Sequence, residues 1–298
     1  MKNNAMISVI VPVFNGEKFI GECLKSILSQ DYENFELIVV DNNSNDKTSK
    51  IVQDLATQYQ KIIYIFESRR SRGAARNAGV LAARGDLIAM TDADCLVPKD
   101  WLKLMSQPIF QGLSSVVMGF QREAITNYWS KMRQIEDENF LKKNQNNNFI
   151  DHLDTKNFII KTEIIKQILF NSNFKNFEDW DFFIKLKKAG LKVYFLPDIQ
   201  VLHFHDSSAK ELFRTQISRA YFASAIIDFH KKDEWFVETF RENIIVLSLR
   251  LRTFLLFIPW SVWQLITRPK KSFYIILADF SWKLGATFYF LSKNRQRR

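Results

Sequence analysis

Strand-like and helix-like hydrophobic patterns alternate along the first third of the chain. The β-branched run over residues 7–13 predicts a buried strand, and apolar positions at helical spacing over 17–30 predict an amphipathic helix after it. The same order then repeats, with strands predicted at 35–40, 61–66 and 86–91 and helices at 46–59 and 72–83. Strands that alternate with helices indicate a mainly parallel sheet joined by right-handed crossovers.

The alternation becomes looser after residue 94. The patterns predict strands at 114–119, 158–160, 192–196 and 200–204, and helices at 124–143 and from Glu178 to near Gly190. The glycine suits the C-cap of the second helix. An Asn-rich, polar stretch over 144–151 predicts a mobile loop that would close as a lid over a ligand.

Two carboxylates follow the fourth predicted strand and are the most informative local feature. Asp92 and Asp94 are spaced i, i+2 after the apolar run. Because alternate strand residues face one side, we expect both to present oxygens together at the strand's carboxyl end, where open α/β sheets bind ligands. Such oxygens suit Mg²⁺ or Mn²⁺ holding a diphosphate. A polar turn that merely ends the strand is the simpler alternative.

Long apolar stretches in the C-terminal part predict further helices. Residues 254–266 are uncharged but contain a proline, and residues 273–291 contain Asp279 and Lys283. A membrane-spanning helix needs about 20 apolar residues, so the first stretch is short. The basic turn at 267–272 would also have to cross the bilayer against the positive-inside tendency. We therefore expect helices lying in the membrane interface, with packing on the main domain and true spanning as alternatives.

The net charge of +10 is concentrated in the same part of the chain. Residues 207–298 carry 16 basic and 7 acidic side chains, a surplus of +9, whereas the first 206 residues carry a net +1. This asymmetry indicates an anionic partner, nucleic acid or membrane, for the C-terminal part only. The apolar and aromatic content there favours an anionic membrane surface, and we expect no nucleic-acid partner.

The cysteines and the N-terminus predict the compartment. Cys23 and Cys95 are too few for a disulfide framework and lack metal-ligand spacing. The N-terminal residues lead into a strand-like run without a long apolar signal core or a cleavage pattern. We expect the protein to stay in a reducing cytoplasm.

Five motifs, in their order and spacing, make the chain resemble the family 2 glycosyltransferases, which are inverting enzymes of the GT-A fold. They are residues 8–15 (SVIVPVFN), 40–46 (VDNNSND), 72–79 (RGAARNAG), 91–94 (TDAD) and Glu178 with Asp179. The resemblance implies an α/β GT-A fold, with a Rossmann-like, mixed and mainly parallel sheet flanked by helices. It implies a catalytic domain over 1–206, divided into a nucleotide-binding half (1–95) and an acceptor-binding half (96–206). Residues 207–298 are then a basic, apolar, helical tail that associates with the membrane.

The resemblance also assigns the nucleotide-sugar donor to residues at the strand ends. It implies that Pro12 and Asn15 line the nucleotide pocket, that Asp41 and Asn42 grip the base or ribose, and that Asp92 contacts the donor. The family usually has a second Asp where this chain has Asn42, which leaves the base open. Turn roles, such as an Asx turn at Asp41, explain these residues without a ligand.

Arg72 and Arg76 begin a predicted helix that points at the same edge of the sheet. Arginine forks match phosphate oxygens, so these side chains are candidates for binding the donor's diphosphate. Salt bridges at the surface are the alternative explanation.

Glu178 and Asp179 form a second acidic point along the chain. An inverting transfer needs a base that takes the proton of the attacking hydroxyl. In the resembled family this pair begins a helix beside the acceptor, and the Asp is the usual base. A carboxylate at a helix N-terminus is also a good cap, and both roles can coexist.

The resemblance places a late histidine near the metal or the diphosphate. His203 is therefore a candidate metal ligand together with Asp94 and Asp92, and His205 is a weaker candidate. A structural role is the alternative for a lone histidine. The expected cofactor is Mn²⁺ or Mg²⁺.

Taken together, these features predict a metal-dependent glycosyltransferase that moves a sugar from a nucleoside-diphosphate sugar to a hydroxyl acceptor with inversion. We expect a glycan or lipid-linked acceptor in bacterial surface glycan synthesis, and a peripheral or monotopic enzyme on the cytoplasmic face of the cell membrane. One alternative is a sugar-phosphate nucleotidyltransferase, although residues 15–18 are a sparse match for its Gly-rich, basic loop. The other alternative is a non-catalytic, basic module that binds nucleotides or nucleic acid.

Overall fold

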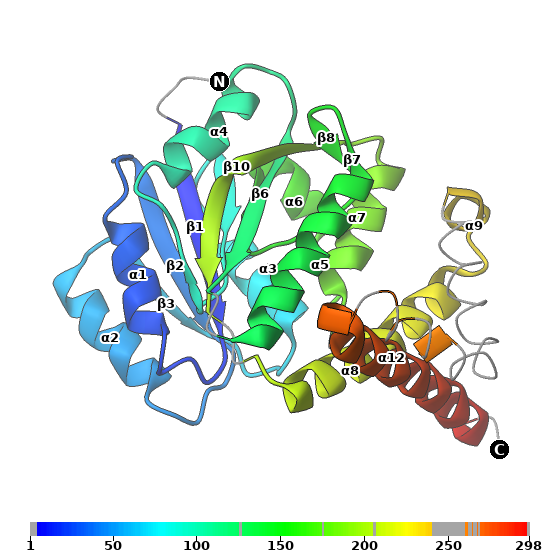
Figure 1. Ribbon diagram of the computed structural model, residues 1–298. Helices are drawn as coiled ribbons and strands as arrows, with labels where there is room; N and C mark the ends of the chain where they lie inside the picture. Colours follow the sequence, from blue (N-terminus) through cyan, green and yellow to red (C-terminus); the bar gives the residue numbers. More distant parts are fainter. Residues whose placement is uncertain are drawn as a thin grey trace. The chain divides into compact units, whose positions relative to one another are not determined.

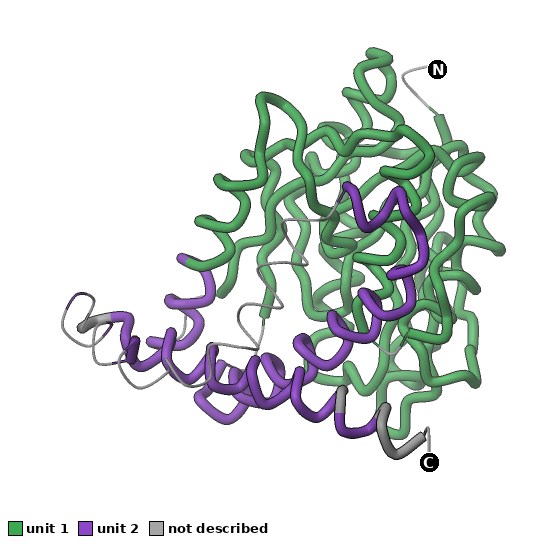
Figure 2. Tube along the Cα trace, turned by 90° about the vertical axis from the view of Figure 1, so that its right-hand side faces the viewer, with its two compact units in different colours: residues 1–124, 136–205 green, residues 125–135, 206–298 purple. Residues whose placement is uncertain are grey.

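The structure is a computed structural model that describes residues 5–124, 127–174, 176–204, 207–239, 260–261, 264, 267 and 269–296. The chain divides into two compact units (Figure 2): unit 1 holds residues 1–124 and 136–205, and unit 2 holds 125–135 and 206–298. The boundary passes through helix α5 (Tyr128–Asn144). The domain limits expected from the sequence remain a prediction.

A mixed sheet with helices on both faces forms the centre of unit 1 (Figure 1). Its ten strands in the described residues run in the order β3 (Ile62–Phe66), β2 (Phe35–Asp41), β1 (Ile7–Val13), β4 (Leu87–Met90), β9 (Phe158–Lys161), β6 (Val116–Glu123), β10 (Val193–His203), β8 (Phe149–Ile150) and β7 (Gln145–Asn146), with β5 (Cys95–Leu96) paired to β10. The predicted mixed sheet flanked by helices is confirmed.

Strand direction determines which residues meet at each edge of this sheet. Strands β3, β2, β1 and β4 are mutually parallel, and β10 is parallel to β6. Strand β9 runs antiparallel between β4 and β6. The carboxyl ends of β1, β2, β4, β6 and β10 therefore share one edge, which also holds the amino end of β9.

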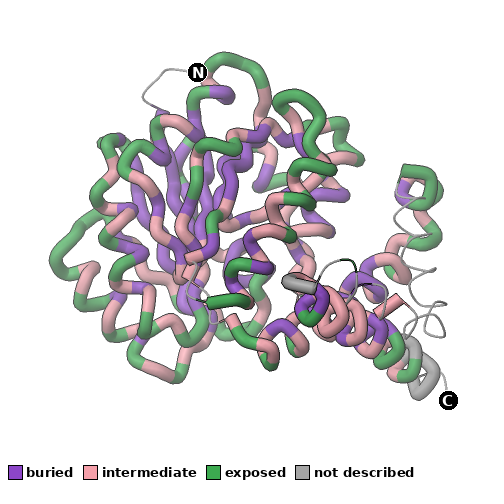
Figure 3. The backbone as a smooth tube through the Cα atoms, in the orientation of Figure 1, coloured by how far each residue is buried: buried purple, intermediate pink, exposed green. Residues whose placement is uncertain are grey.

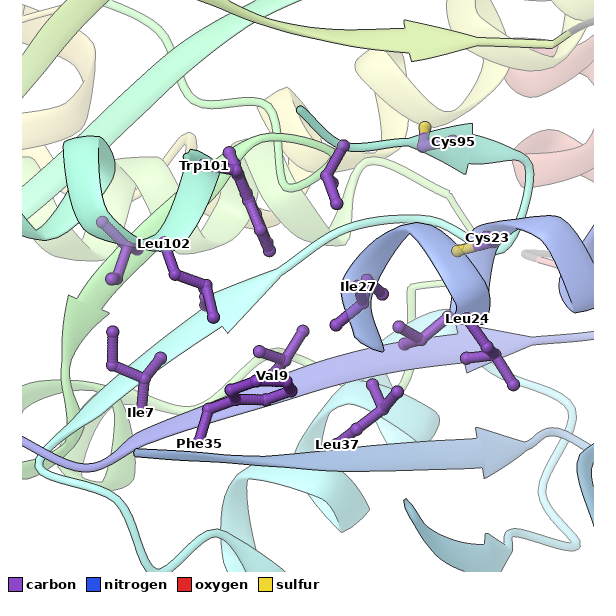
Figure 4. Close-up of a cluster of buried hydrophobic side chains, with 14 of the residues drawn as sticks. Ile7, Val9, Cys23, Leu24, Ile27, Phe35, Leu37, Cys95, Trp101 and Leu102 are labelled. Atoms are coloured by element: carbon purple, nitrogen blue, oxygen red, sulfur yellow. The ribbon is translucent and has the colours of Figure 1, made fainter. Parts of the chain in front are cut away.

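The two faces of the sheet are covered by different helices. Helices α1 (Ile20–Leu28), α2 (Thr48–Gln58) and α4 (Trp101–Phe110) pack in one buried cluster with alternate strand residues such as Val9 and Leu37 (Figure 4). Helices α3 (Arg72–Ala82), α6 (Thr162–Ile168) and α7 (Glu178–Lys188) pack together on the other face. A Cβ on Gly79 of α3 would lie 2.5 Å from Ile10 Cγ2, so glycine permits the close approach. The strands are buried while both helical layers keep exposed outer faces (Figure 3).

The stretch 144–151, predicted as a loop, forms a β-hairpin in its middle, and its closure as a lid stays a prediction. Strands β7 and β8 pair with each other, and Phe149 and Ile150 pair with Tyr194 and Val193 of β10. Asn147 has a φ of 53°, the left-handed conformation that tight hairpin turns require and that Asn tolerates. The polar composition hid a hairpin whose apolar end attaches to the sheet.

The two late strands predicted at 192–196 and 200–204 are one strand, β10. The register against β6 shifts between Leu196 and Gln200, and Pro197 lies within the shift. Proline cannot donate a ladder hydrogen bond and is accommodated at such irregularities. Its presence made one strand resemble two.

Unit 2 contains α8 (Ala209–His230), α9 (Glu234–Thr239) and α12 (Pro269–Gln296) among its described residues. A Cβ on Gly285 would lie 2.1 Å from the carbonyl oxygen of Ile217, so α12 packs closely on α8. Asp279 and Lys283, which interrupt the apolar run, are paired at 2.5 Å. No helix in the described part of the chain is long and apolar enough to cross a membrane. The stretch predicted at 254–266 lies largely outside the described residues.

Candidate active site

The predicted site residues of the first two strands lie at the shared carboxyl edge and are held by hydrogen bonds. Asp41 is buried, and its two carboxylate oxygens accept bonds from the Ser44 N–H and the Tyr64 hydroxyl, both at 2.9 Å. Asn42 Nδ2 donates to the carbonyls of Glu67 (3.3 Å) and Arg69 (2.5 Å). Asp41 and Asn42 thus order the loops beyond β2 and β3. Their part in binding a base or ribose remains a prediction.

The exit of β1 is tied to the loop that follows β2. Asn15 is exposed with a φ of 50°, its N–H donates to Ser44 Oγ, and its Oδ1 accepts from the Asn45 N–H, both at 2.9 Å. Pro12 is half-buried on β1. These contacts fix one wall of the edge where the nucleotide is expected.

Asp92 and Asp94 lie in a turn rather than on a strand. Strand β4 ends at Met90, and the Cys95 N–H donates to the carbonyl of Asp92 at 3.1 Å. The strand alternation that we used to place the two carboxylates together is therefore wrong here. Their different partners, described next, separate their roles.

Arg76 is a buried cation between two acidic residues. It is 4% exposed, and it donates from Nη2 to Asp92 Oδ1 at 3.1 Å and from Nη1 to Glu178 Oε1. Arg76 thus joins the turn after β4 to the beginning of α7. Arg72, one helical turn earlier, is exposed. Since Arg76 is already engaged by two carboxylates, Arg72 is the better placed of the two to meet a diphosphate.

Glu178 and Asp179 differ in environment although they are adjacent. Glu178 is 2% exposed; burial raises its pKa, and the charge of Arg76 opposes that rise. Asp179 is half-buried, and its Oδ1 accepts the Trp180 N–H at 2.8 Å. Phe177, which precedes them, has a φ of 65°, an unusual conformation for a bulky residue and of the kind that clusters at functional sites.

His203 lies between two carboxylates at the end of β10. Its Nε2 is 3.4 Å from Asp94 Oδ2, and its Nδ1 is 2.9 Å from Glu123 Oε1. Burial lowers the pKa of His203, but its hydrogen bonds to Asp94 and Glu123 outweigh burial and raise it to about 9. Burial likewise opposes ionisation of Asp94, and the bond and charge of His203 prevail and lower the pKa of Asp94. His205 lies outside the described residues.

Asp94 and His203 can hold a divalent cation. Ligand atoms of Asp94, Cys95 and His203 lie within 4.8 Å of one another. The Cys95 thiol is buried in the apolar cluster (Figure 4), and burial raises its pKa well above the usual range, so it stays protonated. The remaining oxygen and nitrogen donors suit Mn²⁺ or Mg²⁺, which leave positions for phosphate oxygens. Asp92, predicted as a ligand, is not part of this group among the described residues.

Three contributors to the site escaped the sequence patterns. Glu123 at the end of β6 holds His203, and Tyr64 of β3 holds Asp41. Asp154 and Lys156 form an ion pair just before β9. The Asp154–Lys156 pair had a weak sequence signal, since its opposite charges are two residues apart in a short loop. Glu123 and Tyr64 had none.

Comparison with known proteins decides the class. The sequence profile of Glycosyl transferase family 2 matches residues 8–169, more than half of the chain. The chain belongs to glycosyltransferase family 2. The predicted family is therefore confirmed, and the protein is a glycosyltransferase rather than either alternative.

Related family members come from bacteria and archaea. Glycosyltransferase GlyG of Streptococcus pneumoniae is 26% identical over 76% of this chain and 79% of its own length. The dolichyl N-acetyl-alpha-D-glucosaminyl phosphate 3-beta-D-2,3-diacetamido-2,3-dideoxy-beta-D-glucuronosyltransferase of Methanococcus voltae is 26% identical over 71% of each chain. The match to Streptococcus pneumoniae GlyA is 31% identical but covers 38% of this chain and 16% of GlyA.

Solved glycosyltransferases share the fold. The mannosyltransferase PcManGT from Pyrobaculum calidifontis, in complex with GDP-Man and Mn²⁺, is 18% identical with a TM-score of 0.72 over 97% of this chain and 88% of its own. S. aureus TarS in complex with UDP-GlcNAc is 22% identical with a TM-score of 0.55, over 72% of this chain and 65% of that one. At these identities the likeness establishes the GT-A fold.

Proposed function

We propose that this glycosyltransferase moves a sugar from a nucleoside-diphosphate sugar to a hydroxyl acceptor, with a divalent metal and with inversion. The observation that carries the proposal is the bridge made by Arg76. It brings the beginning of α7, with Asp179, beside the turn after β4, with Asp94. A base and a metal ligand at one sheet edge are what this reaction needs.

Each residue has a defined part in the transfer. Asp94 and His203 would hold Mn²⁺ or Mg²⁺, which when bound offsets charge on the diphosphate leaving group. Asp179 takes the acceptor's hydroxyl proton as that oxygen forms a bond to the anomeric carbon. The bond from that carbon to the diphosphate oxygen breaks, its electron pair stays with the diphosphate, and the anomeric centre inverts. Glu178, buried against Arg76, positions Asp179.

Relatives support the donor class and the acceptor class. PcManGT is in complex with GDP-Man and Mn²⁺, and TarS is in complex with UDP-GlcNAc. The Methanococcus voltae relative is named for a dolichyl-phosphate-linked acceptor. We propose a lipid-linked acceptor, in surface glycan synthesis, for this chain as well.

A donor screen tests the proposed reaction. The full chain is incubated with UDP- and GDP-sugars, with Mn²⁺, with Mg²⁺ or with EDTA, and donor hydrolysis and thermal shift are measured. We expect one donor class to be hydrolysed, and hydrolysis to stop in EDTA. NMR of the product should give the opposite anomeric configuration to that of the donor; retained configuration would exclude the single displacement.

We also propose that unit 2 attaches the enzyme to the cytoplasmic face of the cell membrane. Phe273, Phe288 and Leu291 of α12 are exposed by 61%, 49% and 56%, and the surrounding sequence holds the +9 surplus. Exposed apolar side chains beside basic charge are typical of interfacial membrane helices.

Liposome flotation tests the membrane proposal. The full chain should float with vesicles containing anionic lipid, and added salt should weaken flotation without abolishing it, because screening removes only the electrostatic part. Replacing Phe288 and Leu291 by Gln should reduce flotation, while Leu81→Gln, at a still more exposed apolar position in unit 1, should not. Equal flotation of all three proteins would disprove this membrane face.

A further inference from the structure

Strand β9 brings the loop before it to the edge that holds the candidate active site. Phe158, its first residue, pairs with Met90 of β4 and with Met118 of β6. Because β9 runs antiparallel to both, residues 154–157 lie beside the turn that follows Met90. That turn carries Asp92 and Asp94.

Asn157 fixes this loop in place. Its Oδ1 accepts the Trp101 Nε1–H at 2.8 Å, and its Nδ2 donates to the carbonyls of Phe120 and Ile199, each at 2.8 Å. The side chain is 1% exposed with its donors and its acceptor in use. A buried amide satisfied in this way holds the neighbouring backbone in one conformation.

The loop presents an ion pair next to the turn. Lys156 Nζ is 2.8 Å from Asp154 Oδ2, and the Lys156 N–H donates to Asp154 Oδ1 at 2.9 Å. The two side chains are partly buried, with 19% and 21% of their surface exposed. Burial lowers the pKa of Lys156, but Asp154 and then Asp92 outweigh burial and raise it, so the ammonium lies within electrostatic reach of the turn.

The pair is confined to one loop. Its members are two residues apart in one loop, so the pair ties no distant segments together. Arg84 and Glu36, by contrast, form an ion pair that connects the end of α3 to β2.

We propose that Asp154 and Lys156 form hydrogen bonds with hydroxyl groups of the sugar that the enzyme transfers and so select that sugar. The inference rests on the proposed nucleotide-sugar donor and names the residues that select its sugar. A fixed donor beside a fixed acceptor is complementary to a vicinal diol, in which each hydroxyl both donates and accepts. The separation of Nζ and Oδ2 is close to that of the two oxygens of such a diol.

The diphosphate is a poorer partner for Lys156. Asp154 neutralises the ammonium, so the pair carries no net charge, whereas a diphosphate calls for net positive charge. Hydroxyl recognition calls for the opposite arrangement, a donor and an acceptor side by side. Sites built to bond a hydroxyl discriminate strongly against analogues that place it differently.

The test compares nucleotide sugars with their free diphosphates. Calorimetric titration in Mn²⁺ measures UDP, UDP-glucose, UDP-galactose, UDP-GlcNAc, GDP and GDP-mannose on the full-length wild type, Lys156→Met and Asp154→Asn. Lys161→Met is the control, since Lys161 is at the other end of β9, 3.9 Å from Glu163, and forms a similar i, i+2 pair. Lys156→Arg keeps the charge but displaces the donor, and it serves if the Met variant does not fold.

We expect wild type to bind one nucleotide sugar more tightly than the corresponding diphosphate. Lys156→Met and Asp154→Asn should each reduce that preference by about tenfold, the scale of a charged hydrogen bond, with diphosphate affinity within about threefold of wild type. The control should retain the preference. In both variants, the dissociation constants of the C4 epimers UDP-glucose and UDP-galactose should also become more similar than in the wild type.

Two outcomes overturn the inference while leaving the proposed donor class intact. If the variants lose diphosphate and nucleotide-sugar affinity equally, Lys156 binds the diphosphate. If they keep the wild-type preference, the pair does not touch the sugar. Absence of any binding to the wild type would instead overturn the proposed function.

Discussion

Two pairs of acids meet at the active-site edge, and Arg76 holds one member of each pair. In the turn after β4 it binds Asp92, and at the beginning of α7 it binds Glu178. Asp94 and Asp179, the other members, have different partners. The comparison teaches that the sequence spacing of the acids does not assign their roles. A single buried cation forms hydrogen bonds with one acid of each pair, and we propose that the other two acids act in the chemistry.

The two sets of acids also differ in the kind of cation they face. Arg76 stays charged at any pH relevant to a protein, so Asp92 and Glu178 face a permanent cation. Asp94 faces His203, which can lose its proton and then offer a lone pair to a metal. A permanent cation suits positioning, and a titratable one suits a ligand site.

The largest expected effect is the loss of the separating cation. Arg76→Met leaves Glu178 buried without its positive partner, and breaking a buried pair in this way costs roughly 3–5 kcal/mol. Urea denaturation should therefore find the variant destabilised by that amount. Arg72→Met, on the exposed face of the same helix, is the control and should change the free energy of unfolding by less than about 0.5 kcal/mol. Equal stability of the two variants would contradict a structural role for the Arg76 ion pairs.

The second test separates the acids at the beginning of α7. Asp179→Asn removes the proposed base and should lower turnover by roughly 10²-fold or more, with donor affinity and stability near wild type. Glu178→Gln should behave in the opposite way, with lower stability and a smaller loss of turnover. Steady-state kinetics and urea denaturation of both variants decide the assignment. If Asp179→Asn turns over within threefold of wild type, the base is elsewhere, with Glu178 or Asp181 next to test.

The sequence predicted most of unit 1 because its elements obey local patterns. The β-branched run of β1 and the apolar spacing of α1 contain enough information to place both within a few residues. The motifs also placed Asp41 and His203 at the ends of β2 and β10 and Asp94 shortly after β4, and the topology brings these points to one edge. Parallel strands make that step predictable, since their carboxyl ends meet at one edge.

The parts that sequence missed depend on contacts between distant residues. Arg76 and Glu178 are 102 positions apart, and His203 and Glu123 are 80 apart. No local spacing reveals such pairs. The hairpin at 145–150 was missed for a different reason, because its Asn-rich turn resembles a mobile loop while its attachment to β10 is a tertiary contact.

The pH dependence of the free energy of unfolding tests the pairing of His203 with Asp94 and Glu123. The pKa of His203 is raised to about 9, above its usual 6.5. Its stabilising contribution in metal-free protein is therefore complete below about pH 6.5 and is lost as pH rises through about 9, a decline on the order of 3 kcal/mol. Urea denaturation in EDTA should find this decline in wild type and not in His203→Gln. A wild type with constant stability over that range would disprove the raised pKa.

The smallest expected effect is that of Asp92→Asn on metal affinity. The amide oxygen can still accept from Arg76, and Asp92 is not among the ligand atoms grouped around His203 in the described residues. Mn²⁺ affinity in the presence of UDP or GDP should therefore stay within about threefold of wild type, whereas Asp94→Asn should lose tenfold or more because a carboxylate ligand becomes a neutral one. Mn²⁺ electron paramagnetic resonance measures both affinities directly. If the two variants lose affinity equally, both acids bind the metal, and Arg76 must release Asp92 when the donor arrives.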